Sequence, residues 1–162
     1  MLSNTRRWVF SLAAVLFGLA AVAEPVRADE RNITVVAVLA TDRNTTIDPK
    51  VQGIAEEVKK LEPSLTGFKL VRTTNKPVGV GRKESFPLVD AEMLAVQLLQ
   101  IEPPKEKDKD ERIRLAVKAP LTGEITYSTC CGKFFPILTR YLTKDNERLI
   151  VAVMVKTPPP KK

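Results

Sequence analysis

Two almost wholly apolar segments stand far apart in the 162-residue chain, at positions 33–40 (ITVVAVLA) and 149–155 (LIVAVMV). Both are rich in β-branched residues, and neither alternates apolar with polar positions as a half-exposed strand does. A strand with such a sequence is covered on both of its faces. We therefore expect these segments to be central strands that lie side by side in one sheet.

A single helix is predicted shortly after the first of these strands. Asp48 and Pro49 form a typical helix start, an N-cap residue followed by proline in the first turn. Apolar residues then recur at three- and four-residue spacing, and Pro63 ends the pattern. The spacing predicts an amphipathic helix of about four turns. Its apolar stripe comprises Val51, Ile54, Ala55, Val58 and Leu61.

Beyond Gly67 the apolar period becomes that of strands. Strands are expected at 68–72, 112–119, 125–131 and 134–141, with shorter extended pieces at 78–80, 86–88 and 94–98, a turn at 75–77 and an exposed polar loop at 102–111. The pattern predicts an α+β fold, mainly an antiparallel β-sheet or sandwich of about seven strands with one N-terminal amphipathic helix. We expect a single domain over 29–157 and a disordered tail at 158–162.

The first 28 residues have the pattern of an export signal. A basic pair, Arg6 and Arg7, precedes an apolar run at 8–23, and small residues suited to cleavage follow at Ala23 and Ala28. The run is shorter than the ~20 residues of a spanning helix. The segment TRRWVF is similar to a twin-arginine signal, but Val9 stands where that family usually has Phe, which favours Sec export. We expect a periplasmic or extracellular protein without stable membrane insertion after cleavage.

Composition excludes several classes of site. The chain has no histidine, so Ser-His-Asp or Cys-His catalysis and imidazole metal ligation are impossible. Removal of residues 1–28 takes away three basic residues, one acidic residue and the single Trp, which lowers the net charge from +7 to +5. Few aromatic residues remain for base stacking, so a nucleic-acid partner is not expected.

The adjacent pair Cys130 and Cys131 is the most unusual feature, and it has three interpretations. On a strand, neighbouring side chains point to opposite faces, so Cys131 would lie with Ile125 and Tyr127 while Cys130 faces the other way. Both would then be structural thiols, the interpretation that we favour. A disulfide is the second, because Gly132 permits a turn and export provides an oxidising compartment. Thiol redox or soft-metal function is the third, although no further Cys or His completes a site.

A row of basic residues, Arg112, Arg114 and Lys118, is predicted on the solvent side of one strand. Such a row could bind a polyanion, or it could keep a strand face charged and solvated. Acidic residues also gather in predicted turns, but nothing in the sequence fixes their mutual distances. They are Asp42, Asp48, Asp90 and Glu92. We predict no catalytic, cofactor-binding or metal-ligating residue.

The order of these features resembles a family of small exported bacterial proteins with no assigned function. An apolar strand, D-P opening a helix, G-F-K-L-V and a terminal L-I-V-A-V carry the resemblance over about 33–156. It includes no catalytic motif and implies no functional residue. The sequence predicts a non-enzymatic exported domain that binds or assembles with a protein or a cell-surface polymer. A thiol redox or soft-metal protein and a polyanion-binding surface module are the alternatives.

Overall fold

The computed structural model describes residues 29–104 and 110–156. The predicted signal peptide and the predicted disordered tail lie outside these residues. The described elements are β1 (Glu30–Thr41), a 3₁₀ turn (Pro49–Val51), α1 (Gln52–Leu61), β2 (Gly67–Gly79), β3 (Lys83–Pro87), β4 (Met93–Glu102), β5 (Arg112–Lys118), β6 (Glu124–Cys130), β7 (Phe134–Leu142) and β8 (Arg148–Lys156).

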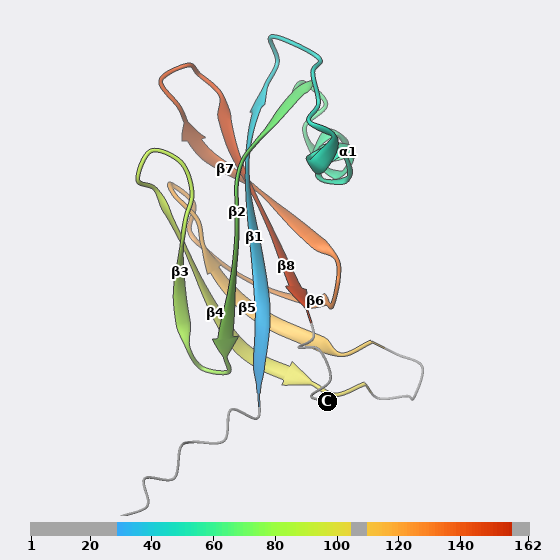
Figure 1. Cartoon of the computed structure of the whole chain (residues 1–162), viewed down its shortest axis with the longest axis vertical. Helices are drawn as coiled ribbons and strands as arrows, with labels where there is room; N and C mark the ends of the chain where they lie inside the picture. Colours follow the sequence, from blue (N-terminus) through green and yellow to red (C-terminus); the bar gives the residue numbers. More distant parts are fainter. Residues whose placement is uncertain (1–28, 105–109, 157–162) are drawn as a thin grey trace, which may run out of the picture.

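The strands form two four-stranded antiparallel sheets that pack face to face (Figure 1). Sheet A has the order β2-β1-β8-β7, and sheet B has the order β3-β4-β5-β6. The chain passes from sheet A to sheet B after β2 and returns after β6. Apolar side chains from the inner faces of both sheets make the main core. The fold is therefore mostly antiparallel β-sheet with one short helix, broadly α+β as predicted.

The two apolar segments occupy the centre of sheet A. β1 and β8 pair with each other from Asn32 opposite Lys156 to Ala40 opposite Arg148. Alternate residues of both strands face sheet B, and the intervening residues contact α1 and its neighbours. This burial on both faces explains why neither strand alternates with polar residues. The prediction of two adjacent central strands is confirmed.

The helix α1 covers part of the outer face of sheet A. Its residues Ile54, Ala55 and Val58 pack on apolar side chains of that face. At its start the Asp48 carboxylate accepts a hydrogen bond from the Lys50 backbone N–H at 2.9 Å, as predicted for an N-cap. The helix is shorter than predicted, because its first turn is 3₁₀. Leu61, predicted to lie on the buried stripe, is its last residue and is 66% exposed.

The described part of the chain forms eight strands, not about seven. The short pieces predicted around Phe86 and Leu94 belong to full strands, β3 and β4, because these side chains are completely buried in the core. The predicted turn at 75–77 is wrong. β2 continues through Pro77, which lies opposite Asn32 of β1. As an edge strand, β2 can contain a proline because one of its sides needs no ladder hydrogen bond.

An aromatic stack lies between β6 and β7, where the chain returns to sheet A. The rings of Tyr127 and Phe135 are 4.0 Å apart between centroids and inclined by 17°. The Tyr127 hydroxyl is buried without a hydrogen-bond partner among the described residues. Burial raises the pKa of Tyr127 far above its usual range, since the phenolate would lose its hydration.

Candidate functional site

The outer face of sheet B carries the predicted basic row. Ile113, Leu115 and Val117 of β5 are completely buried on the inner face, so the alternating side chains of this strand lie on the outer face, where Ala116 is also buried. Arg112, Arg114 and Lys118 are all exposed there. The structure thus places the three residues on one face of one strand, which lies between β4 and β6 in sheet B.

Acidic residues on the neighbouring strands interrupt this row. Arg112 lies opposite Glu102 of β4, and Lys118 lies opposite Glu124 of β6. Arg114 instead has Gln100 and Ser128 as its cross-strand neighbours. Opposite charges facing each other across strands reduce the net field of both residues. Of the three cations in the row, Arg114 therefore has the least opposite charge on its cross-strand neighbours. It is the cation most available to a negatively charged partner.

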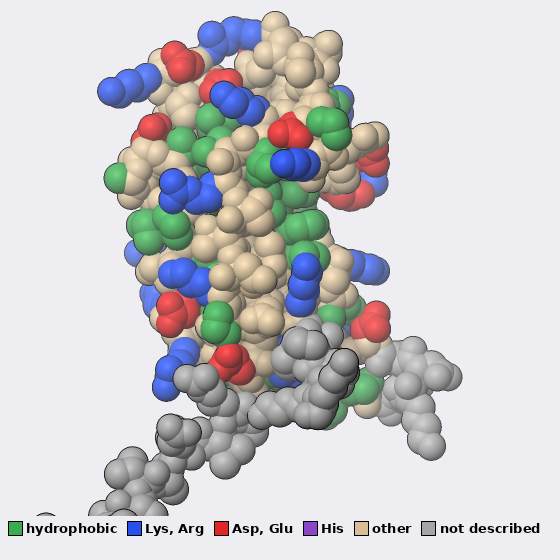
Figure 2. Space-filling view, in the orientation of Figure 1, with side chains coloured by type: hydrophobic (Ala, Val, Ile, Leu, Met, Phe, Trp, Pro, Cys, Tyr) green, Lys and Arg blue, Asp and Glu red, His purple; other side chains and the backbone are tan. Residues whose placement is uncertain are grey.

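Basic and acidic side chains are mixed over the molecular surface more generally. On the face shown in Figure 2, Lys and Arg side chains are separated by Asp and Glu side chains along the length of the described structure. A surface of this kind attracts an anion at particular residues rather than through one large positive field.

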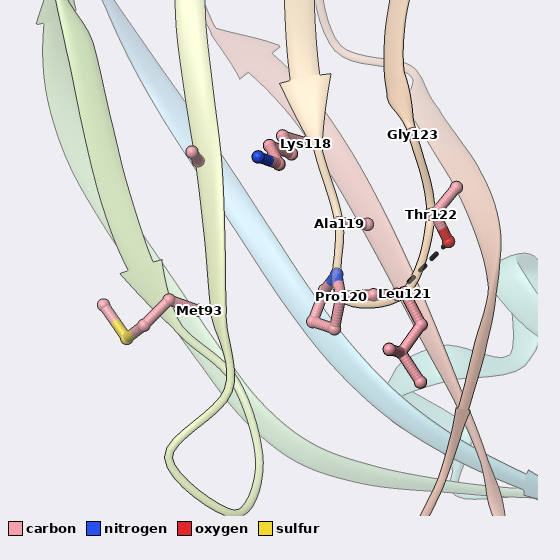
Figure 3. Close-up of a pocket in the computed structure, with 8 residues that line it drawn as sticks. Met93, Lys118, Ala119, Pro120, Leu121, Thr122 and Gly123 are labelled. Atoms are coloured by element: carbon pink, nitrogen blue, oxygen red, sulfur yellow. Dashed lines mark hydrogen bonds between the residues drawn. The ribbon is translucent and has the colours of Figure 1, made fainter.

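An open depression lies at one end of the basic row (Figure 3). Its volume is about 410 Å³, and Met93 and Leu121 stand on opposite sides of it. These side chains are 46% and 71% exposed, so both are available for contact with an apolar group. The lining residues are Met93, Ala95, Lys118, Ala119, Pro120, Leu121, Thr122 and Gly123.

The loop after β5 shapes this depression with strained backbone. Leu121 has φ of +52°, a left-handed conformation that non-glycine residues adopt at a cost of about 1–2 kcal/mol. The Thr122 hydroxyl donates a hydrogen bond to the Pro120 carbonyl oxygen at 3.2 Å, which tightens the turn. This depression between Met93 and Leu121 was not predicted from the sequence. The Pro-Leu-Thr-Gly segment indicates a turn, but not that an exposed leucine would stand opposite Met93.

The two cysteines point to different surroundings, and the structure shows no disulfide between them. Cys130 ends β6 on the outer face of sheet B, where Arg112 is its cross-strand neighbour. Cys131 begins the turn to β7 and packs against the core between the sheets. Its Sγ lies 3.8 Å from Oε2 of Glu111, and the thiol donates to that carboxylate. Adjacent side chains that diverge in this way serve separate contacts.

Glu111 also forms a two-point ion pair with Arg31. Nε of Arg31 lies 3.0 Å from Oε2 of Glu111, and a second guanidinium nitrogen lies 2.6 Å from Oε1. The side chains are only 11% and 19% exposed. Hydrogen bonding to Glu111 raises the pKa of Arg31, although burial acts in the opposite direction. The pair joins β1 of sheet A to the residue preceding β5 of sheet B.

This ion pair was not predicted from the sequence. Glu111 was expected in an exposed polar loop at 102–111, and it is in fact half-buried. Arg31 and Glu111 are 80 residues apart, and the pairing depends on how the two sheets pack. The polar composition around Glu111 gave no local signal for it.

The predicted turn carboxylates do not form a metal site. Asp48 caps the helix start, and Asp90 accepts a hydrogen bond from the Tyr141 hydroxyl at 3.0 Å. Partial desolvation and this hydrogen bond raise the pKa of Tyr141. Within residues 29–104 and 110–156, no three Cys, Asp or Glu side chains lie close enough together to hold a metal ion.

Comparisons with known proteins give no relative for this chain. No protein-family model, no curated protein and no solved structure matches it. The resemblance to small exported bacterial proteins therefore gains no support from them. No helix in the described part of the chain has the length and apolar character needed to cross a membrane.

Proposed function

We propose that the chain is a non-catalytic binding or assembly domain, exported to the periplasm or the cell surface, that binds its partner on the outer face of sheet B. The observation that carries this proposal is the exposure of Arg112, Arg114 and Lys118 on β5. Their side chains provide hydrogen-bond donors and charge, which suit recognition rather than proton transfer.

The neighbours of the row also favour a contact surface. Ala95, opposite Lys118, and Ser128, opposite Arg114, are small residues, so that a partner can approach the long basic side chains closely. Arg114, between Gln100 and Ser128, presents a guanidinium that can bind a carboxylate, sulfate or phosphate through two parallel hydrogen bonds. We therefore infer that the partner carries negative charge at the contact.

Retention of the full chain on a sulfated or phosphorylated matrix tests this proposal. We expect elution to move to lower salt concentration in the double variant Arg112→Ala and Arg114→Ala, because surface charge interactions are screened by salt. The double variant Lys69→Ala and Arg72→Ala is the matched control, since it also removes two exposed positive charges, from β2 of sheet A. Retention that the first double variant leaves unaltered would remove this face as the binding surface.

A thiol function of Cys130 and Cys131 is the second candidate. Cys130 favours it, because reactive cysteines lie in electropositive, partly exposed surroundings, and Cys130 lies opposite Arg112 on the outer face of sheet B. A redox pair requires two thiols that react with each other, whereas these side chains lie in separate surroundings. We expect a thiol reagent to modify Cys130 first in the native chain and both thiols equally after unfolding. Rapid joint modification in the native chain would support the thiol function and count against the binding domain.

A further inference from the structure

The basic row and the open depression are parts of one surface. Lys118 belongs to both, as the last residue of the row and as part of the lining beside Met93 and Leu121 (Figure 3). Arg114 and Pro120 are six positions apart, which corresponds to roughly 20 Å along an extended chain. A partner that contacts both ends must therefore be elongated.

The two ends of this surface offer different chemistry. At one end, Arg114 presents a guanidinium whose direct cross-strand neighbours, Gln100 and Ser128, carry no charge. At the other, the depression is lined by the exposed side chains of Met93 and Leu121 together with Ala95, Ala119 and Pro120. The surface is complementary to a ligand that is anionic at one end and apolar at the other.

We propose that the partner is an extended acidic polypeptide segment that places a carboxylate on Arg114 and a bulky apolar side chain between Met93 and Leu121. This inference rests on the proposed function, since it uses the same face of sheet B. It adds the chemical class of the partner and a second contact about 20 Å from the first.

The observations favour a polypeptide over other anionic partners. A small amphiphile needs a cavity that encloses most of its surface, and this depression is open. An anionic membrane surface would meet Glu102 and Glu124, which lie directly opposite Arg112 and Lys118. A polypeptide with acidic and neutral side chains can place its carboxylates on the cations alone.

Two fluorescent peptides test the inference against the full chain. Both are about 10 residues long and alternate glutamate with serine, which is long enough to span the surface when extended. One carries leucine near its end, and the other carries serine in that position. We expect the leucine peptide to bind about tenfold more tightly in fluorescence anisotropy, because its side chain is removed from water in the depression.

The variant Leu121→Asn should abolish this advantage. Asparagine has a similar shape, and it tolerates the left-handed backbone of this position, so the loop is preserved. Leu61→Asn is the matched control, because Leu61 is an equally exposed leucine at the end of α1. Arg114→Ala should weaken both peptides about fivefold, as expected when a charge-assisted hydrogen bond is lost.

The outcomes separate this inference from the proposed function. Equal affinities for the two peptides, with both weakened by Arg114→Ala, would overturn the apolar contact and leave the binding face supported. Failure of both peptides to bind, with intact salt-sensitive retention on the anionic matrix, would overturn a polypeptide partner. Binding to phosphatidylglycerol vesicles that Leu121→Asn weakens would identify a membrane surface as the partner and overturn the inference in favour of a lipid.

Discussion

The two sheets differ in what lies on their outer faces. The outer side of β1 and β8 in sheet A is apolar and packs against α1 through residues such as Val38 and Ile150. The outer side of β5 in sheet B is basic and exposed. Both sheets have buried inner faces, so the difference lies entirely in the alternate positions of the central strands. Sheet A is thus covered on its outer face by a helix of the same chain, whereas Arg112, Arg114 and Lys118 on the outer face of sheet B are exposed to solvent.

Introduction of a charge beneath α1 should give the largest loss of stability. Ile54 is 5% exposed against sheet A, and Ile54→Asp would bury a carboxylate without a partner. We expect a loss of at least about 4 kcal/mol in the free energy of unfolding. Thr126→Asp, on the exposed face of sheet B, should cost about 1 kcal/mol at most. Urea unfolding measures both, and equal losses would contradict the difference between the two faces.

Loss of the ion pair between the sheets should give the next largest effect. Glu111→Gln keeps the shape of the side chain but leaves Arg31 without its opposite charge. We expect a loss of about 2 kcal/mol in unfolding free energy, because removing one partner of a largely buried pair strands the other charge. Glu57→Gln is the control, since Glu57 pairs with Lys60 in full exposure on α1. A loss no greater than that of the control would show that the pair does not hold the sheets together.

Alkaline pH should lower the stability of the fold through Tyr127, which lies on the inner face of sheet B. Above about pH 10 the unfolded chain loses the proton of this tyrosine, while the folded chain keeps it, because burial raises the folded-state pKa. The unfolded state is then favoured as pH rises. Relative to Tyr127→Phe, the native protein should lose about 1.4 kcal/mol per pH unit beyond pH 10. Chemical denaturation measures the free energy of unfolding at each pH. If it changed with pH in the same way for both proteins, the burial of Tyr127 would be contradicted.

The smallest effect concerns a single hydroxyl on the outer face of sheet A. Thr34 Oγ1 is buried and has no hydrogen-bond partner among the described residues. Thr34→Val removes this polar group at nearly constant shape, so we expect a gain of about 1 kcal/mol. Thermal unfolding would show it as a rise of a few degrees. The same change at exposed Thr126 of sheet B should shift the midpoint less, and equal shifts would erase the contrast between the faces.

Local patterns predicted the central strands, the start of the helix and the buried face of β5. The continuous apolar runs predicted two central strands, and the alternation of 112–119 predicted which face of β5 is buried. Asp48 and Pro49 predicted the helix start. Each of these depends on residues that are neighbours in sequence, where spacing alone determines which side chains share a face. The basic row was found for the same reason.

Features created by the packing of distant segments could not be predicted. Pro77 indicated a turn because the sequence does not show that β2 lies at the edge of its sheet. The contact of Glu111 with Arg31 and the position of Leu121 opposite Met93 depend on register and on loop geometry. Neither leaves a period or a motif in the sequence. The basic row of the candidate site was thus predicted from the sequence, whereas its apolar residues, Met93 and Leu121, were not.

The pairing of β1 with β8 has a consequence for how the chain folds. Residues opposite each other in these strands, such as Asn32 and Lys156, are separated by roughly 120 residues of sequence. Sheet A is therefore incomplete until the last strand is available, and the loop closed by this contact is among the costliest to form. Until then β1 has an apolar edge that invites pairing with other chains. Folding of sheet A thus depends on a contact between two strands, β1 and β8, that are distant in the sequence.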